Sequence, residues 1–551
     1  MCGIVGIWSN DNANIREKYV KKILDKQYHR GPDNTDMISI NNIILGHNRL
    51  AIIDLSQNAN QPFTSNCGRY TIVFNGEIYN YLEIKSELEY DFQTSSDTEI
   101  LLASYMKYGI DCLKKLNGMF AFAIYDRLEN TLFCARDRIG KKPFVYSEYE
   151  NGFYFASELA ALFSIGIFSD EPDDIGAVYS NLRNFRHIPE PYTRYKIIRR
   201  LEPAHAMMIK DKKIVKKWCY WSPGMQYDNS IKVDDVYDIV CSAIKLRQRA
   251  DVEIGILLSG GVDSSAVAAV MSKNGLKPRA FTLRGDDEEL QRAKLVASKF
   301  DLELNIFEYN RSTAKELYAK MIEIYGEEVR LLPLVHAARL YEQISKCGIK
   351  VVMSGIGADE IFYGYDGIDR QLLFSDMIKL IEILPNKILK IFEKIFQRNS
   401  ELKLLFELAQ KQNLLRKGYL YRKEAIQKGF KNFDYSNLID FWANKVKTNN
   451  YIDVSSWIGL ISENAHSITI SGDLPSMMYS IETRAPFLDF RVIEMAFKID
   501  AHKKVSKKAN KLILKQAFER LLPYEILYAK KKGFGYGLQT NTNEEYNFFN
   551  K

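Results

Sequence analysis

A cysteine at position 2 is the residue whose type and place in this chain most directly indicate chemistry. Met1 is followed by a small residue, so we expect Met1 to be removed and Cys2 to carry a free α-amine. An α-amine has a reference pKa of about 8, and it can act as the base that activates the thiol of the same residue. The sequence therefore predicts a nucleophile and its base on one residue.

A thiol that attacks an amide needs certain other residue types nearby, and these types occur within the next hundred residues. Such an attack creates an oxyanion, which an Asn side-chain amide and a Gly backbone N–H can stabilise. An Arg guanidinium suits a carboxylate because it can donate two parallel hydrogen bonds. These residue types occur in four segments, namely His29-Arg30-Gly31-Pro32-Asp33, Gly46-His47-Asn48-Arg49-Leu50, Phe74-Asn75-Gly76-Glu77-Ile78-Tyr79-Asn80 and Ser95-Ser96-Asp97-Thr98-Glu99.

Together with Cys2, the four segments resemble the class II glutamine amidotransferase domain over about residues 1–200. In that family an N-terminal cysteine attacks the side-chain amide of glutamine. The resemblance implies that Asn75 and Gly76 form the oxyanion hole. The fold that it implies is the αββα sandwich of N-terminal-nucleophile glutaminases.

The same resemblance assigns the residues that hold the substrate. It implies that Arg49 binds the carboxylate of glutamine, and that Asp97 and Glu77 bind its ammonium group. Taken singly, an Asn-Gly pair is often only a hairpin turn, and a lone Arg is usually a solvated charge. The presence of all four segments in one order favours the functional interpretation.

A second set of candidate residues follows an apolar run at residues 254–258. Glycines let backbone N–H groups approach phosphate oxygens, and the N-terminus of the next helix adds a favourable partial charge. The loop that follows the run, Ser259-Gly260-Gly261-Val262-Asp263-Ser264-Ser265, resembles the pyrophosphate loop of ATP pyrophosphatases. That loop lacks the terminal Lys-Ser/Thr of a Walker A loop. The resemblance implies ATP binding by Leu257, Ser259, Gly260, Gly261, Asp263, Ser264 and Ser265.

Another glycine-containing loop, Ser354-Gly355-Ile356-Gly357-Ala358-Asp359-Glu360, follows the strand predicted at residues 350–353. By resemblance Ser354 and Gly355 approach the nucleotide, and Lys531 stabilises the departing pyrophosphate. Asp263 and Asp359 would serve magnesium, because hard carboxylate oxygens suit that ion.

Across nearly its whole length the chain resembles the glutamine-hydrolysing asparagine synthetases. The resemblance implies two half-reactions that require glutamine, ATP and Mg2+: adenylylation of an acceptor carboxylate, and its amidation by ammonia from glutamine. Ile356 stands where the family usually has an acidic residue, and residues 330–334 are apolar, so the resemblance does not determine the acceptor carboxylate. Aspartate and the uronic acids of surface polysaccharides both remain open. A third alternative is a regulatory homologue without catalysis. It is remote because Cys2, Asp263 and Asp359, which such a homologue would normally have lost, are all present.

Two patterns of elements must position these residues. Up to about residue 200, short strands alternate with turns, which predicts sheet layers covered by helices. Further on, strands and helices alternate, which predicts a doubly wound parallel sheet. The α/β chain is thus divided into a glutaminase domain at residues 1–208, a linker at 209–232, and an ATP domain at 233–551 with a helical insert at about 369–452.

Composition excludes several classes of protein. The 551 residues are 46% hydrophobic and 26% charged, and the net charge of +7 comes from interleaved charges, so nucleic acid is not expected as a partner. The seven cysteines are scattered, which suggests neither a disulfide framework nor a zinc site. The sequence contains no uncharged apolar run of 18 residues, so we expect no transmembrane helix. We expect a cytoplasmic protein, and the family suggests a homodimer. The basic amphipathic segment Lys387–Phe396 either covers a core or lies on a membrane surface.

Overall fold

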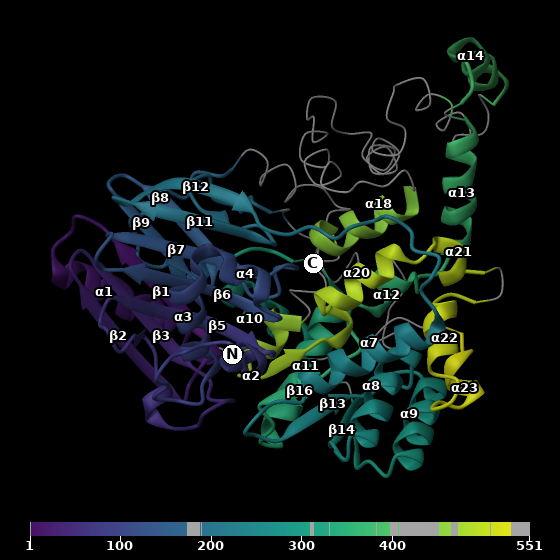
Figure 1. The fold of residues 1–551 in the computed structure, drawn as a ribbon, viewed down its shortest axis with the longest axis horizontal. Helices are drawn as coiled ribbons and strands as arrows, with labels where there is room; N and C mark the ends of the chain where they lie inside the picture. Colours follow the sequence, from purple (N-terminus) through teal and green to yellow (C-terminus); the bar gives the residue numbers. More distant parts are fainter. Residues whose placement is uncertain are drawn as a thin grey trace.

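The computed structural model describes residues 2–173, 190–308, 313–329, 331–381, 383–396, 451–463, 472–506 and 509–530, together with Ile188 and Phe406. Most of the predicted helical insert therefore lies outside the described residues, as does Lys531. Figure 1 shows the chain as two bodies side by side, with the N-terminal sheets in purple and blue and the C-terminal part in teal to yellow.

The N-terminal body contains two antiparallel sheets of six strands each. The first has the order β10-β8-β9-β1-β3-β2 and consists of β1 (Gly3–Trp8), β2 (Asn34–Ile40), β3 (Ile43–Arg49), β8 (Val145–Tyr149), β9 (Gly152–Ala156) and β10 (Arg199–Arg200). The second has the order β12-β11-β7-β6-β5-β4 and consists of β4 (Phe63–Thr64), β5 (Tyr70–Ile78), β6 (Gly118–Asp126), β7 (Thr131–Arg136), β11 (His205–Lys210) and β12 (Lys213–Cys219).

The two sheets pack face to face because alternate residues of each strand are apolar and point to the same side. Trp8 and Ile4 of β1 meet Val73 of β5 in the core between the sheets. Helices cover the outer faces, namely α1 (Ala13–Lys26) and α5 (Leu159–Phe163) on the first sheet, and α3 (Asp97–Tyr108) and α4 (Cys112–Lys115) on the second. This arrangement confirms the predicted αββα sandwich.

One part of the predicted linker is instead a strand. Residues 213–219 form β12, which pairs antiparallel with β11 and extends the second sheet at its edge. The prediction was wrong here because the strand is rich in lysine, and an edge strand with one solvated face gives a weak hydrophobic signal. The connection between the two bodies therefore begins after Cys219.

The C-terminal body is built on a parallel sheet of order β15-β14-β13-β16-β17. Its strands are β13 (Ile254–Leu257), β14 (Ala280–Arg284), β15 (Leu304–Glu308), β16 (Val351–Met353) and β17 (Glu482–Arg484), and all four pairings are parallel. Ile256 and Met353 point into one apolar cluster, while Leu257 and Val352 point into another on the opposite face. Helices cover both faces, which confirms the doubly wound sheet.

The inner strands β13 and β14 are each followed by a long helix, and β16 is followed by the short helix α12 (Ala358–Phe362). The helices of this body are α7 (Val233–Leu246), α8 (Val262–Lys273), α9 (Asp287–Lys299), α10 (Ala314–Tyr325), α11 (Leu332–Lys346), α12, α13 (Ile368–Ile381), α14 (Asn386–Ile395), α18 (Tyr451–Ile458), α20 (Phe490–Lys498), α21 (Ala501–Lys504), α22 (Leu512–Ala517) and α23 (Tyr524–Leu527). Among the described residues, no helix has the length and apolarity that crossing a membrane requires.

Buried charges join the two bodies. Asp473, in the helical segment 472–477, accepts hydrogen bonds from Arg30 and from Lys142 of the N-terminal body. Burial by itself raises the pKa of Asp473, but the charges of Arg30 and Lys142 outweigh it and lower the pKa to about 2. An apolar cluster that includes Leu50 and Met477 lies at the same interface.

We predict that Asp473→Asn destabilises the fold by about 3 kcal/mol at neutral pH, because it leaves two buried cations less compensated. The folded-state pKa of about 2 lies below the ordinary 3.8, so this stabilisation exists above pH 3.8 and is lost as the pH falls toward 2. Urea unfolding of both proteins, followed by circular dichroism at neutral pH and near pH 2, measures the difference in their free energy of unfolding. Asp301→Asn, which removes an exposed ion pair with Lys277, is the control and should change little. A loss that persists at low pH would contradict the assignment.

Candidate active site

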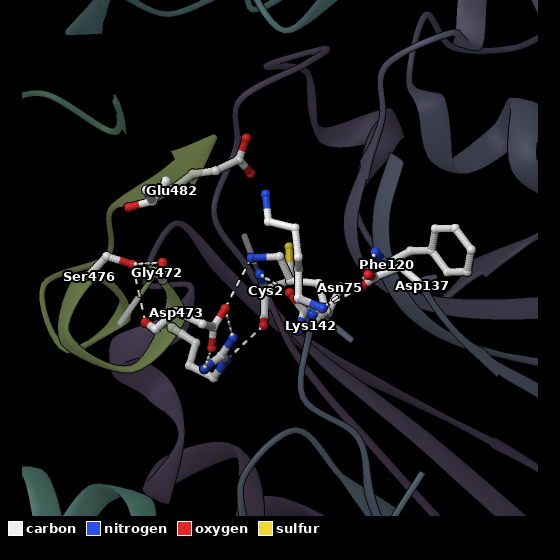
Figure 2. Close-up of polar contacts among 12 residues, drawn as sticks. Cys2, Asn75, Phe120, Asp137, Lys142, Gly472, Asp473, Ser476 and Glu482 are labelled. Carbon is white, nitrogen blue, oxygen red and sulfur yellow. Dashed lines mark hydrogen bonds and ion pairs between the residues drawn. The ribbon is translucent and has the colours of Figure 1, made fainter. Parts of the chain in front are cut away.

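Cys2 directly precedes β1 and lies beside Asn75 of β5. The backbone N–H of Cys2 donates a hydrogen bond to Asn75 Oδ1 at 3.0 Å, and both residues are buried (Figure 2). No described residue accepts a hydrogen bond from Asn75 Nδ2, which is also buried. The two sheets thus place an unsatisfied amide donor next to the thiol, as stabilisation of an oxyanion requires.

Strand β5 runs to Ile78 and so includes Asn75 and Gly76. Because it pairs in register with β6, Gly76 lies opposite Phe120 and Asn75 opposite Ala121. The Asn-Gly pair is therefore not a hairpin turn. It lies inside a strand, where its neighbours fix its orientation.

Two buried carboxyl groups lie near Cys2 and Asn75, which together we call the cysteine centre. Asp97, the first residue of α3, accepts a hydrogen bond from the backbone N–H of Ile78 at 2.9 Å. Burial raises its pKa to about 7, and the charges of Glu482 and Cys2 add to the effect. Burial and the charge of Asp97 also raise the pKa of Glu77, against the influence of Arg484. A cationic group that enters beside these acids would favour their ionised forms.

Arg49 ends β3, and its neighbour Asn48 lies opposite Gly3 in the sheet register. The guanidinium is nearly buried, and it donates to the carbonyl of Ser56 and to Asn60 Oδ1, each at 2.7 Å. The loop at residues 53–60 therefore holds Arg49 at the edge of the cysteine centre.

The C-terminal body supplies one wall of the centre, which sequence reasoning missed. Arg30 donates to the carbonyl oxygen of Cys2 at 3.0 Å, and its guanidinium also pairs with Glu158 and Asp473. Lys142 reaches the same Asp473 at 3.0 Å, as Figure 2 shows. Asp473 is more than 300 positions from both Arg30 and Lys142, and no local pattern marks Asp473 or Lys142 as functional.

A second set of buried ion pairs connects the two bodies. Arg484 lies at the end of β17, and its guanidinium contacts Glu482 Oε1 at 2.6 Å and Glu77 Oε2 at 3.2 Å. All three side chains are buried. The predicted glutamine-binding residue Glu77 is thus already engaged in an interaction between the bodies.

The loop after β13 has a geometry that suits the binding of a phosphate group. Ser259 Oγ lies 3.1 Å from Ser264 Oγ and accepts a hydrogen bond from the N–H of Gly261, so two hydroxyls organise the turn. Helix α8 begins at Val262, and its N-cap residue Gly261 has no side chain that could satisfy the first N–H groups. These N–H groups and the helix dipole favour an anion at this end.

The loop after β16 lies against the first loop because β13 and β16 are neighbours in the sheet. A Cβ atom at Gly355 would lie only 2.8 Å from the Cβ of Asp263, so the close approach requires glycine. The Ser354 hydroxyl donates to the carbonyl of Arg484, which ties this loop to β17. The predicted ATP-binding residues that the structure describes therefore gather at the carboxyl ends of two adjacent strands.

A lysine that the sequence did not indicate lies between the two predicted metal ligands. The ammonium of Lys511 is 2.5 Å from both Asp263 Oδ2 and Asp359 Oδ1, and the residue is almost fully buried. Lys511 has a left-handed backbone with φ of 55°, and a Cβ at Gly364 would overlap its side chain. Two carboxylates that share one ammonium are close enough to share one metal ion.

The region expected to hold the acceptor is apolar. Ile356 packs at the margin of the core beneath the parallel sheet. Leu331, Leu332 and Leu334 are buried in a cluster with Leu474, so they serve packing. The apolar sequence there reflects a core, while Arg330 and Lys531 lie outside the described residues.

The comparisons with known proteins agree with this geometry. Residues 1–221 match the family model of the glutamine amidotransferase domain, and residues 235–549 match that of asparagine synthase. Asparagine synthetase [glutamine-hydrolyzing] 1 of Bacillus subtilis is 28% identical, over 97% of this chain and 87% of its own. Amidase chyE of Penicillium rubens is also 28% identical, over 97% of this chain and 88% of its own.

The asparagine synthase model alone spans more than half of the chain, and the amidotransferase model spans most of the rest. Both matches confirm the resemblance that the cysteine centre and the phosphate loop indicated. The protein therefore belongs to the glutamine-hydrolysing asparagine synthetase family, whose members are ligases that use glutamine and ATP.

Proposed function

We propose that the protein converts aspartate to asparagine, with ATP and with ammonia derived from glutamine. The observation that carries the proposal is the presence in one chain of two centres, a cysteine beside an unsatisfied Asn75 amide and a phosphate loop that faces two carboxylates. Buried ion pairs hold the two centres in a fixed relation.

In the first half-reaction, the thiol of Cys2 attacks the side-chain amide of glutamine, which expels ammonia and leaves a glutamyl thioester on Cys2. Water then hydrolyses the thioester, which releases glutamate and restores the thiol. Removal of Met1 gives Cys2 the α-amine that accepts the thiol proton. The Asn75 side-chain amide and the Gly76 backbone N–H stabilise the oxyanion. Arg49 binds the substrate carboxylate, and Asp97 with Glu77 binds the ammonium group, which favours the ionised form of Asp97.

In the second half-reaction, the aspartate carboxylate attacks the α-phosphate of ATP, which gives an acyl-AMP and pyrophosphate. The loop at residues 259–265 and the N-terminus of α8 hold the phosphates. Asp263 and Asp359 are fit to hold Mg2+, which would neutralise charge on the departing pyrophosphate. Lys531 would assist that departure.

Ammonia from the cysteine centre then displaces AMP from the acyl-AMP. Ammonia that escapes into water is readily protonated, and ammonium is not a nucleophile. The interface closed by Asp473 and by Arg484 lies beside Cys2, and it supports a shielded transfer between the centres.

A second acceptor is favoured by Ile356. An isoleucine cannot hydrogen-bond a substrate or take up a proton, and it stands where the family usually has an acidic residue. A relative that covers almost the whole chain is named as an amidase rather than as an asparagine synthetase. The alternative proposal is therefore amidation of a uronic acid of a surface polysaccharide by the same two half-reactions.

We predict that the purified enzyme with glutamine, ATP, Mg2+ and aspartate forms asparagine, AMP and pyrophosphate in equal amounts. Cys2→Ala should abolish synthesis from glutamine and retain synthesis from ammonia, because only the nucleophile is lost. Chromatography of amino acids and nucleotides measures all products. Glutamate release without asparagine would overturn aspartate as the acceptor, and uronic acids would then be assayed.

We expect Asn75→Ala to lower kcat for glutamine hydrolysis by about 100- to 1,000-fold, the usual effect of removing one oxyanion donor. Synthesis from ammonia should be unchanged, since the ATP centre is intact. Asn42→Ala, at the exposed turn between β2 and β3, is the matched control. Equal losses with glutamine and with ammonia would assign Asn75 a structural role only.

Magnesium binding can be separated from activity by thermal unfolding. In the wild type the ion must displace the Lys511 ammonium from Asp263 and Asp359, whereas in Lys511→Met the carboxylates repel each other until a cation binds. We therefore expect MgCl2 to raise the unfolding midpoint more in Lys511→Met than in the wild type.

Two further variants control this experiment. The exposed Lys498→Met should respond as the wild type does, and the double variant Asp263→Asn with Asp359→Asn should not respond at all. A magnesium response in the double variant would place the ion elsewhere.

A further inference from the structure

Two helices, α13 and α14, stand away from the parallel sheet at one edge of the molecule. Figure 1 shows α13 extending outward from α21 and α14 at its outer tip. Neither helix contributes a residue to the cysteine centre or to the phosphate loops. Their surface is therefore available for another purpose.

Helix α14 has an inward apolar stripe that is already covered. Leu389 is only 1% exposed, and the rings of Phe392 and Phe396 stack on each other and on Phe406. Leu389, Phe392 and Phe396 follow the i, i+3, i+7 spacing of one helix face. This stripe accounts for the part of the helix that covers a core.

A second apolar stripe of the same helix is exposed. Ile388, Ile391 and Ile395 have the same spacing, displaced by one residue, and are 38%, 57% and 63% exposed. Since successive residues of a helix are rotated by about 100°, this stripe lies beside the covered one. A helix that only covers a core would not need three further isoleucines on its outer side.

Lysines form the next stripe. Lys387, Lys390 and Lys394 are all exposed and again follow the i, i+3, i+7 spacing. They are displaced by one more residue, so the lysine stripe borders the isoleucine stripe along the whole helix. The result is an apolar surface with a positive margin.

The apolar surface continues before α14. Ile383, in the turn between the helices, is 80% exposed, and Leu380 near the end of α13 is 69% exposed. Single exposed aliphatic residues are common on soluble proteins, but a group of this kind on adjacent elements marks an interaction site.

We propose that the outer edge formed by α13, the turn at Ile383 and α14 docks on an anionic membrane surface. The isoleucines enter the boundary between headgroups and acyl chains, and the lysines contact anionic headgroups. This inference goes beyond the amidation reaction and does not depend on its acceptor.

The lysine margin distinguishes a membrane from a second copy of the chain. A symmetric dimer through this edge would place the lysine stripe of one copy against the same surface of the other. Like charges would then meet, whereas an anionic bilayer complements them.

The test is sedimentation of the full chain with vesicles of phosphatidylcholine and phosphatidylglycerol, compared with vesicles of phosphatidylcholine alone. The wild type should sediment with the anionic vesicles, and less so at high salt. The triple variant Ile388→Asn, Ile391→Asn, Ile395→Asn should lose binding. Replacement of Lys387, Lys390 and Lys394 by Gln should weaken binding by roughly fivefold for each lysine, about a hundredfold in total.

Two controls keep the result specific. Leu128→Asn with Val215→Asn replaces exposed aliphatic residues of the N-terminal body, which are 71% and 61% exposed, and should bind as the wild type does. Circular dichroism and urea unfolding establish that each variant is folded. Wild type that stays in solution with both vesicles would overturn the proposal. So would binding that survives the isoleucine changes, or self-association in ultracentrifugation that those changes abolish while vesicle binding is absent.

Discussion

The buried guanidinium of Arg484 is the interaction on which the relation of the two centres depends. It pairs with Glu482 of its own strand and with Glu77 of the opposite body, and it donates to the carbonyl oxygens of Arg247 and Arg249. Removal of such charges from water is costly unless every partner is in place. The strand that carries Arg484 therefore has one permitted position against the N-terminal sheets.

That position also determines the geometry of the phosphate loops. The carbonyl oxygen of Arg484 accepts hydrogen bonds from the backbone N–H and from the hydroxyl of Ser354, which begins the second loop. Gly355 then lies against Asp263 of the first loop. A single residue at the end of β17 is thus in contact with the Glu77 carboxylate through its side chain, and with the loop after β16 through its backbone.

Much of the fold was predictable from the sequence because the information was local. The strands of both bodies carry continuous or alternating apolar residues, and the segments around Cys2, Asn75 and Ser259 occur in the order that the family resemblance requires. The contacts of Asp473 and Lys511 were not predictable, since each meets its partners only after the chain has folded. A buried lysine and an exposed one have the same letter in a sequence. The edge strand β12 was missed for a related reason, because its lysines are solvated on one face.

The charge match around Asp473 has a consequence for how this gene can recombine. Families built from two catalytic bodies can diversify by exchanging one body between relatives through gene recombination. Here Arg30, Lys142 and Glu77 of one body are neutralised by Asp473 and Arg484 of the other, all in buried positions. A hybrid protein in which only one body was replaced would have unpaired buried charges at the interface between the bodies. The two halves of this gene are therefore constrained to descend together, although each is organised around its own centre.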